Sequence, residues 1–132
     1  MAETVRNPAS EVFAEWAKAI KPVVGEGNYA SDNSTVIAKT PFARLYMMGN
    51  PSGAMDLEGN ECSTLPAFQS ESFASGQTAI NDVYAIDDVS HKAMISMGFK
   101  RTFGPELIAN MDSRIKRCVS RYSRVFAADD VF

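Results

Sequence analysis

Few residues in this sequence are of types that support catalysis, and their spacing fits no common reaction. His91 is the only histidine, so the chain cannot build a two-histidine metal site or a Ser-His-Asp triad with a second base. It stands beside Lys92 on the polar side of a predicted helix, where we expect a surface side chain. Asp87 and Asp88 are neighbours, and neighbours on a helix point about 100° apart. We therefore interpret them as solvated or capping residues rather than as an acid/base pair.

Motifs for metal, phosphate or thiol chemistry are also missing. Asp56, Glu58 and Glu61 alternate along a polar segment, but the glycine and oxygen-ligand spacing of an EF-hand is absent. The sequence has no P-loop and no dinucleotide-binding glycine motif. The two cysteines, Cys62 and Cys118, form no CxxC or Cys/His pattern, and Cys118 lies in an alternating stretch where a small core residue is expected. The residues therefore favour no catalytic site, cofactor or metal.

Charge is unevenly distributed along the chain. The formal net charge of the 132 residues is −3, to which residues 1–99 contribute −6 and residues 100–132 contribute +3. The bases of the second part are Lys100, Arg101, Arg114, Lys116, Arg117, Arg121 and Arg124. Such polarity suits a chain that docks head to tail on its own copies or on a charged partner. It equally suits a solvated strand face without a partner.

The length and the 45% hydrophobic composition fit one globular domain spanning residues 1–132. No apolar run is long enough for a membrane helix, and the first residues lack the apolar core of a secretory signal. We therefore expect no membrane partner and a chain that stays in the compartment where it is made.

The first helix is predicted to open at Asn7-Pro8 or Ser10. Its apolar residues recur at helical spacing: Phe13, Trp16, Ala17, Ile20 and Val24. Lys21-Pro22 is expected to end or kink this helix. The polar stretch 26–40 predicts a loop, with a short extended piece at 35–38.

Two strands are predicted next, separated by a polar connection. Residues 42–48 form the first. Residues 49–61 are expected to form a flexible loop or arm, in which the stretch 54–61 is either a hairpin tip or a mobile arm. Residues 63–73 form the second, with side chains that alternate between two faces. Pro66 cannot donate to a strand ladder, so we expect this strand at a sheet edge or with a bulge.

A second helix is predicted between Ser75, as its cap, and Gly98, as its stop, with a break at 87–88. A short strand at 99–103 and a basic strand at 115–126 follow. Residues 127–132 are expected to fray. The element order predicts an α+β fold, in which two helices pack on one face of a small antiparallel or mixed sheet.

Nucleic-acid binding is the main generic alternative. The basic strand, with Tyr122 interleaved, would offer cations and a stacking ring. Acidic residues lie close by in sequence: Glu106, Asp112, Asp129 and Asp130. No RRM or helix-turn-helix signature accompanies the basic residues. A small-ligand module is a further alternative that the residues leave open.

Between residues 42 and 124 the layout resembles the tail-terminator, or tail-completion, proteins of long-tailed bacteriophages, in the version called a minor capsid protein in prophages. An amphipathic helix leads to the Pro-aromatic strand at 41–45, and the acidic connection at 56–61 enters the strand at 67–73. A helix then ends in MGFKR at 97–101, and the basic strand IKRCVSRYSR at 115–124 closes the pattern.

The resemblance implies a structural virion protein that forms a ring, usually hexameric, on the end of the tail tube. The ring would stop tube polymerisation and offer a surface to head–tail connector proteins, with DNA passing through its lumen. It implies no enzyme and a location in the virion, after assembly in the host cytoplasm. A head–tail joining protein of the same neck is the alternative within this class. Candidate assembly contacts pair acids with bases of a neighbour: Asp56, Glu58, Glu61, Lys100, Arg101, Arg114, Arg117, Arg121 and Arg124.

Overall fold

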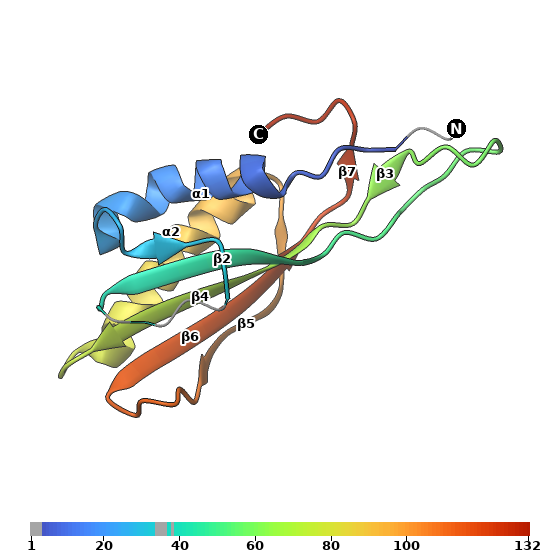
Figure 1. Ribbon diagram of the computed structural model, residues 1–132. Coiled ribbons are helices and arrows are strands. Elements are labelled where there is room, and N and C mark those ends of the chain that lie inside the picture. The colour runs from blue at the N-terminus through green and yellow to red at the C-terminus, as the bar shows by residue number, and fades with distance from the viewer. Residues whose placement is uncertain (1–3, 34–36, 38) are drawn as a thin grey trace.

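Two helices cover one face of a five-stranded sheet in the computed structural model, which describes residues 4–33, 37 and 39–132 (Figure 1). The helices are α1 (Ala9–Val24) and α2 (Ala79–Ser96). The strands are β1 (Tyr29–Ala30), β2 (Phe42–Gly49), β3 (Ser63–Thr64), β4 (Ala67–Ser75), β5 (Lys100–Ile108), β6 (Ile115–Ser123) and β7 (Phe126–Ala127).

The large sheet is mixed. Its strand order is β1-β2-β4-β6-β5, with β1 parallel to β2 and the other neighbours antiparallel. β3 and β7 form a separate antiparallel pair. The predicted α+β class, with two helices packed on one face of the sheet, is confirmed. The extended piece expected at 35–38 lies almost wholly outside the described residues, and β1 occupies a position for which the sequence predicts loop.

The core lies between the two helices and strands β2, β4 and β6. The buried residues of α1 recur every four positions: Val12, Trp16, Ile20 and Val24. The Trp16 indole N–H donates to the Ser90 hydroxyl of α2 at 2.8 Å, so the largest core side chain leaves no unsatisfied donor. Phe68 of β4 packs edge-on against Phe99, with 5.4 Å between ring centroids.

Pro22 does not end α1, the first of the two effects expected of Lys21-Pro22. It lies within the last turn, where its missing N–H removes a single helical hydrogen bond. The helix continues to Val24, and the Gly25 N–H donates to the Lys21 carbonyl at 2.9 Å. Loss of one bond so close to the end leaves the buried stripe intact.

The second helix begins later than predicted and runs without a break. Ser75 ends β4 instead of capping a helix, and Thr78 precedes α2, with its hydroxyl donating to the Asp82 carboxylate at 2.9 Å. The break expected at 87–88 is wrong, because Asp87 is buried against the sheet with partners of its own. Gly98 stops the helix as predicted: its φ of +85° is the left-handed conformation of a helix C-terminus.

β4 lies in the middle of the sheet, between β2 and β6. The predicted alternation is confirmed here: Phe68 faces the helices, whereas Glu71 faces the opposite side. Pro66 does not place the strand at an edge. It lies between β3 and β4, where the chain passes from one sheet to the other, so no ladder hydrogen bond is lost.

The strand predicted at 99–103 is longer, because β5 continues through Gly104-Pro105 to Ile108. β5 is an edge strand, where a proline without an N–H is tolerated. The register with β6 shifts on both sides of Phe103. Gly104 has a φ of +84°, and a Cβ there would lie 2.2 Å from the Val119 carbonyl oxygen.

The C-terminal residues pack on the body instead of fraying. The Phe132 ring stacks on Phe126, with centroids 5.4 Å apart, and Arg124 donates to the Asp130 carboxylate at 2.9 Å. Arg6 donates to two backbone carbonyls of this segment. Arg124 and Phe126 lie just before this segment and Arg6 lies at the other end of the chain, so the composition of the last six residues alone does not predict their order.

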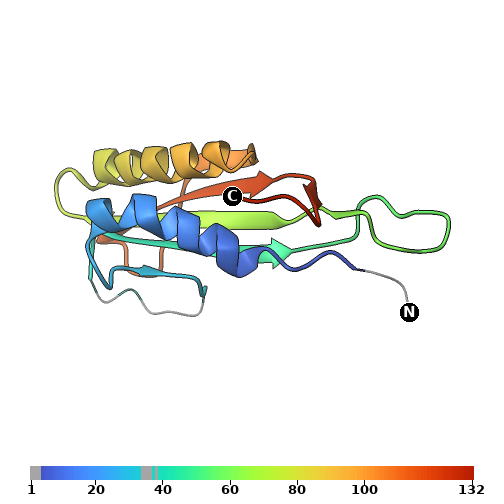
Figure 2. The same cartoon turned by 90° about the horizontal axis from the view of Figure 1, so that it is seen from above.

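The connection between β2 and β3 projects from the body as an arm (residues 50–62), seen from two directions in Figures 1 and 2. Met55 and Glu61 face each other across an isolated antiparallel bridge. The Cys62 N–H donates to the Ala54 carbonyl at 2.8 Å. Of the two alternatives for residues 54–61, the structure has the hairpin tip.

The close approach of β5 to β6 predicts that Gly104→Ala destabilises the fold. The methyl group would clash with the backbone of β6 and would also force alanine into the left-handed region. We expect a loss of more than about 2 kcal/mol in the free energy of unfolding, measured by urea denaturation. Gly76→Ala is the matched control, because Gly76 has a φ of +97° but open space around it. Equal losses in the two variants would contradict the clash.

Candidate functional site

The sheet face opposite the helices carries a buried carboxylate at its centre. Glu71 of β4 has a fully buried side chain, flanked across the sheet by Arg44 of β2 and Arg117 of β6. One carboxylate oxygen accepts from Arg44 Nη2 at 2.9 Å and from Arg117 Nε at 2.6 Å. The other accepts from the Tyr46 hydroxyl at 2.6 Å and from Gln69 Nε2 at 3.0 Å. We call this surface the Glu71 face.

These partners keep Glu71 ionised. Burial raises the pKa of its carboxyl, but the four hydrogen bonds outweigh that effect and lower the pKa to about 2. Tyr46 shows the reverse effect: burial and its bond to Glu71 raise the pKa of the phenol to about 12. The site therefore holds one carboxylate and two guanidinium groups throughout the physiological pH range.

A third arginine, Arg121, lies on the Glu71 face. Arg121 Nε donates to the Gln69 side-chain oxygen at 2.9 Å, and its guanidinium lies 4.8 Å from the centre of the Phe103 ring. Three arginines from two strands, β2 and β6, thus lie around or beside Glu71 on this face. Arg44, Tyr46, Gln69 and Glu71 are absent from the residues predicted as contacts. The available signal was the alternation of 67–73, which places Gln69 and Glu71 on one face of a strand.

A second polar cluster is buried on the helix side of the sheet. Asp87 accepts from Arg101 Nη2 at 2.9 Å and from the Ser120 hydroxyl at 2.7 Å, so the interpretation of Asp87 as solvated or capping is wrong. His91 Nδ1 lies 3.1 Å from the Tyr122 hydroxyl, and the ring is half-buried instead of on the surface. Burial lowers the pKa of His91, helped by the positive charge of Arg101. His91 thus joins a hydrogen-bonded network with Tyr122, Arg101, Asp87 and Ser120.

The predicted basic contacts do not form one patch. Arg101 is committed to Asp87, and Arg117 to Glu71. Arg124 is held by Asp130 and by the Met97 carbonyl. The remaining predicted bases are exposed: Lys100, Arg114 and Arg121.

The three predicted acids lie on the arm, but they have different roles. Asp56 accepts from the backbone N–H of Asn60 at 2.8 Å and of Glu58 at 2.9 Å, and these bonds, that of Asn60 first, lower the pKa of Asp56. Glu61 accepts from the Ser52 hydroxyl and from the backbone N–H of Val5. Asp56 therefore shapes the tip and Glu61 fixes the base. Within the described residues, the Glu58 carboxylate makes no ion pair.

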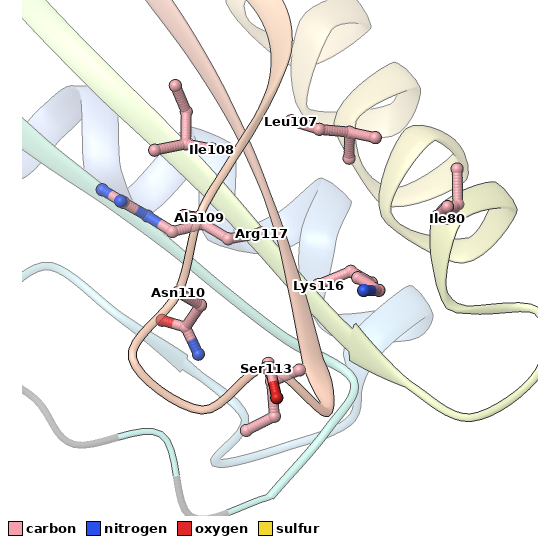
Figure 3. Close-up of a pocket in the computed structure, with 9 residues that line it drawn as sticks. Ile80, Leu107, Ile108, Ala109, Asn110, Ser113, Lys116 and Arg117 are labelled. Atoms are coloured by element: carbon pink, nitrogen blue, oxygen red, sulfur yellow. The ribbon is translucent and has the colours of Figure 1, made fainter.

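An apolar groove lies at the end of the sheet farthest from the arm. It has a volume of about 300 Å³ and opens between the start of α2 and the hairpin that joins β5 to β6 (Figure 3). Its apolar lining includes Ile80, Leu107 and Ile115, and Lys116 stands beside it. Ile80 and Leu107 are each close to half exposed and lie together in this groove, so a partner could bury both of them. We call this site the distal groove.

Neither polar cluster has the layout of a catalytic centre. Burial raises the pKa of the Cys118 thiol to about 12, so the thiol stays protonated and belongs to the core. Among the described residues, no group of three His, Cys, Asp or Glu side chains could hold a metal ion, and no helix there is long and apolar enough to cross a membrane. Searches against protein-family models and against curated proteins find no match. Function must therefore be inferred from the residues and their geometry.

The buried carboxylate predicts that Glu71→Gln destabilises the protein at neutral pH. The substitution keeps the shape but leaves Arg44 and Arg117 facing each other without a counter-charge. We expect a loss of about 3 kcal/mol in the free energy of unfolding, measured by urea denaturation. Arg121→Gln is the control: it removes an exposed guanidinium and should cost less than about 1 kcal/mol.

The same carboxylate predicts how the difference in unfolding free energy between the wild type and Glu71→Gln depends on pH. Because the pKa of Glu71 is lowered by folding, its contribution is complete above about 4.5, the ordinary value, and is lost as the pH falls toward about 2. Glu71→Gln has no such group to protonate. The gap in unfolding free energy between wild type and variant should therefore narrow over this interval. A gap that stays constant from pH 7 to pH 2 would contradict the assignment.

Proposed function

We propose that this protein is a structural component of a bacteriophage tail, which joins copies of itself head to tail into a closed ring on the end of the tail tube. The ring stops tube polymerisation and presents a surface for head–tail connector proteins, with DNA passing through its lumen. The protein then works in the virion, after assembly in the host cytoplasm. It is a binding and assembly protein, not an enzyme.

One observation carries this proposal: the two features most suited to contact lie at opposite ends of the body. The arm projects from one end of the sheet (Figures 1 and 2), and the residues that line the distal groove lie at the other end, at the start of α2 and on the hairpin that joins β5 to β6. Unlike patches at opposite ends favour a heterologous contact, which builds a ring when its rotation closes. The resemblance of residues 42–124 to tail terminators supports the same conclusion.

The geometry counts against the nucleic-acid alternative. Tyr122, the ring expected to stack on bases, is fully buried on the helix side of β6. Arg117 and Arg124 are already committed to carboxylates of the same chain. Continuous cationic tracks with exposed aromatic rings are what single-stranded nucleic-acid binders use. What remains on the surface fits weak contact with DNA inside a ring, not a dedicated binding groove.

The proposal predicts that the purified chain forms a closed oligomer or caps tail tubes. Light scattering across protein and salt concentrations should show a discrete mass above that of the monomer, free of nucleic acid. Electron microscopy of tail tubes with the protein added should show tubes of fixed length with density at one end. A strict monomer that leaves tubes unchanged would overturn the proposal. Retention of nucleic acid at moderate salt by that monomer would favour the binder instead.

A further inference from the structure

We propose that the arm tip of one copy docks in the distal groove of the next, with Leu57 as the apolar anchor and Glu58 facing Lys116. This contact rests on the proposed ring, and it names the surfaces that build it. The occupant of the groove is therefore a second copy of this chain. Each copy uses its arm once and its groove once.

The arm tip carries apolar side chains that nothing in its own chain covers. Leu57 is fully exposed and Met55 is more than half exposed. Exposing large aliphatic side chains to water at the end of a projecting hairpin is unfavourable, so their burial by a partner stabilises the complex. A flexible loop would lose much of this gain in ordering, but the Asp56 hydrogen bonds already fix the turn. The tip is thus a preformed apolar projection.

The distal groove offers the complementary shape. Its volume of about 300 Å³ is at the small end of the range for ligand pockets, which suits one or two aliphatic side chains. Figure 3 shows Ile80 and Leu107 on the side of α2, with Asn110 and Ser113 on the hairpin opposite. The apolar lining can receive Leu57, and the polar hairpin can bond to the backbone of a visiting turn.

Charge at the two sites is also complementary. Glu58 and Lys116 are both exposed, and neither forms an ion pair within the part of the chain that the structure describes. Asp112, on the groove hairpin, is paired with Arg114 at 2.9 Å and so does not oppose an incoming acid. An acidic tip that approaches Lys116 therefore meets an uncompensated cation. An exposed ion pair of this kind contributes more to the orientation of the two copies and to their rate of association than to the affinity of the contact.

The arm cannot reach the groove of its own chain. β4 and β6 are nine residues each, a length of roughly 30 Å, and the arm and the groove lie beyond opposite ends of them (Figure 1). The contact must therefore join different molecules. One such contact is small, but closing a ring makes the last contact intramolecular and strengthens the whole assembly.

Cross-linking tests the contact directly. Chains carrying Leu57→Cys are mixed with chains carrying Ile80→Cys, both with Cys62→Ser, and oxidised under mild conditions. Mass spectrometry should find the 57–80 disulfide between copies. Val131→Cys mixed with Ile80→Cys is the control, because Val131 is also strongly exposed but lies in the C-terminal segment. Equal yields of the two cross-links would overturn the contact.

A charge exchange gives a second test. Glu58→Lys and Lys116→Glu should each raise the concentration of half-assembly several-fold, and the double variant should restore it. Leu57→Asp should raise that concentration about tenfold or more, whereas Val131→Asp should not. Circular dichroism checks that each chain folds. Normal assembly of Leu57→Asp would overturn the contact.

The outcomes separate this contact from the proposed function. A closed ring that is insensitive to Leu57→Asp and Lys116→Glu would reject the arm–groove contact and leave the ring proposal standing. Open filaments that these variants dissolve would support the contact and reject a closed ring. A wild-type chain that is monomeric, gives no specific cross-link and ignores tail tubes would reject both.

Discussion

The structure depends on one buried carboxylate in the middle of its sheet. Glu71 lies on the central strand, on the face that neither helix covers, and its charge is costly to bury without compensation. Arg44 and Arg117 supply that compensation from the strands on either side. A shift of either strand by one residue would turn its arginine to the other face and leave the Glu71 carboxylate without that partner. The pairing of β2, β4 and β6 is thus specified electrostatically as well as by the core beneath it.

The fixed pairing of β2, β4 and β6 also fixes the positions of the segments at the two ends of the sheet. β2 and β4 carry the arm between them, and β6 begins at the distal groove. Fixing these three strands in register therefore fixes the direction in which the arm projects relative to the groove. A ring needs such fixity, because small errors in the angle between successive copies accumulate around it. The Glu71 network would then serve assembly without touching a neighbour.

The sequence predicts the fold class, the helix stop at Gly98 and the alternation within β4, because each follows from local spacing or backbone chemistry. It misses what depends on distant partners. The sequence predicts Asp87 as solvated, but the sheet brings Arg101 and Ser120 to it. The sequence also predicts a frayed tail, but Arg6 from the other end of the chain donates to two backbone carbonyls there. The Glu71 face is missed for the same reason: its arginines come from strands far apart in the chain.

The three acids of the arm have different roles because their hydrogen-bond partners differ. Three carboxylates within six residues look equivalent in sequence, and all three were candidates for a neighbour's arginines. Asp56 instead accepts from backbone N–H groups of the hairpin tip, whereas Glu61 accepts from the backbone N–H of Val5 outside the hairpin and so ties the arm to the N-terminal segment. That use orders the arm before any partner arrives, so binding has less entropy to overcome. Within the described residues, it leaves Glu58, beside the exposed Leu57, as the one acid of the three whose carboxylate makes no hydrogen bond within the chain. A hairpin built this way is a rigid probe, and a rigid probe is what a groove in a neighbouring copy can recognise.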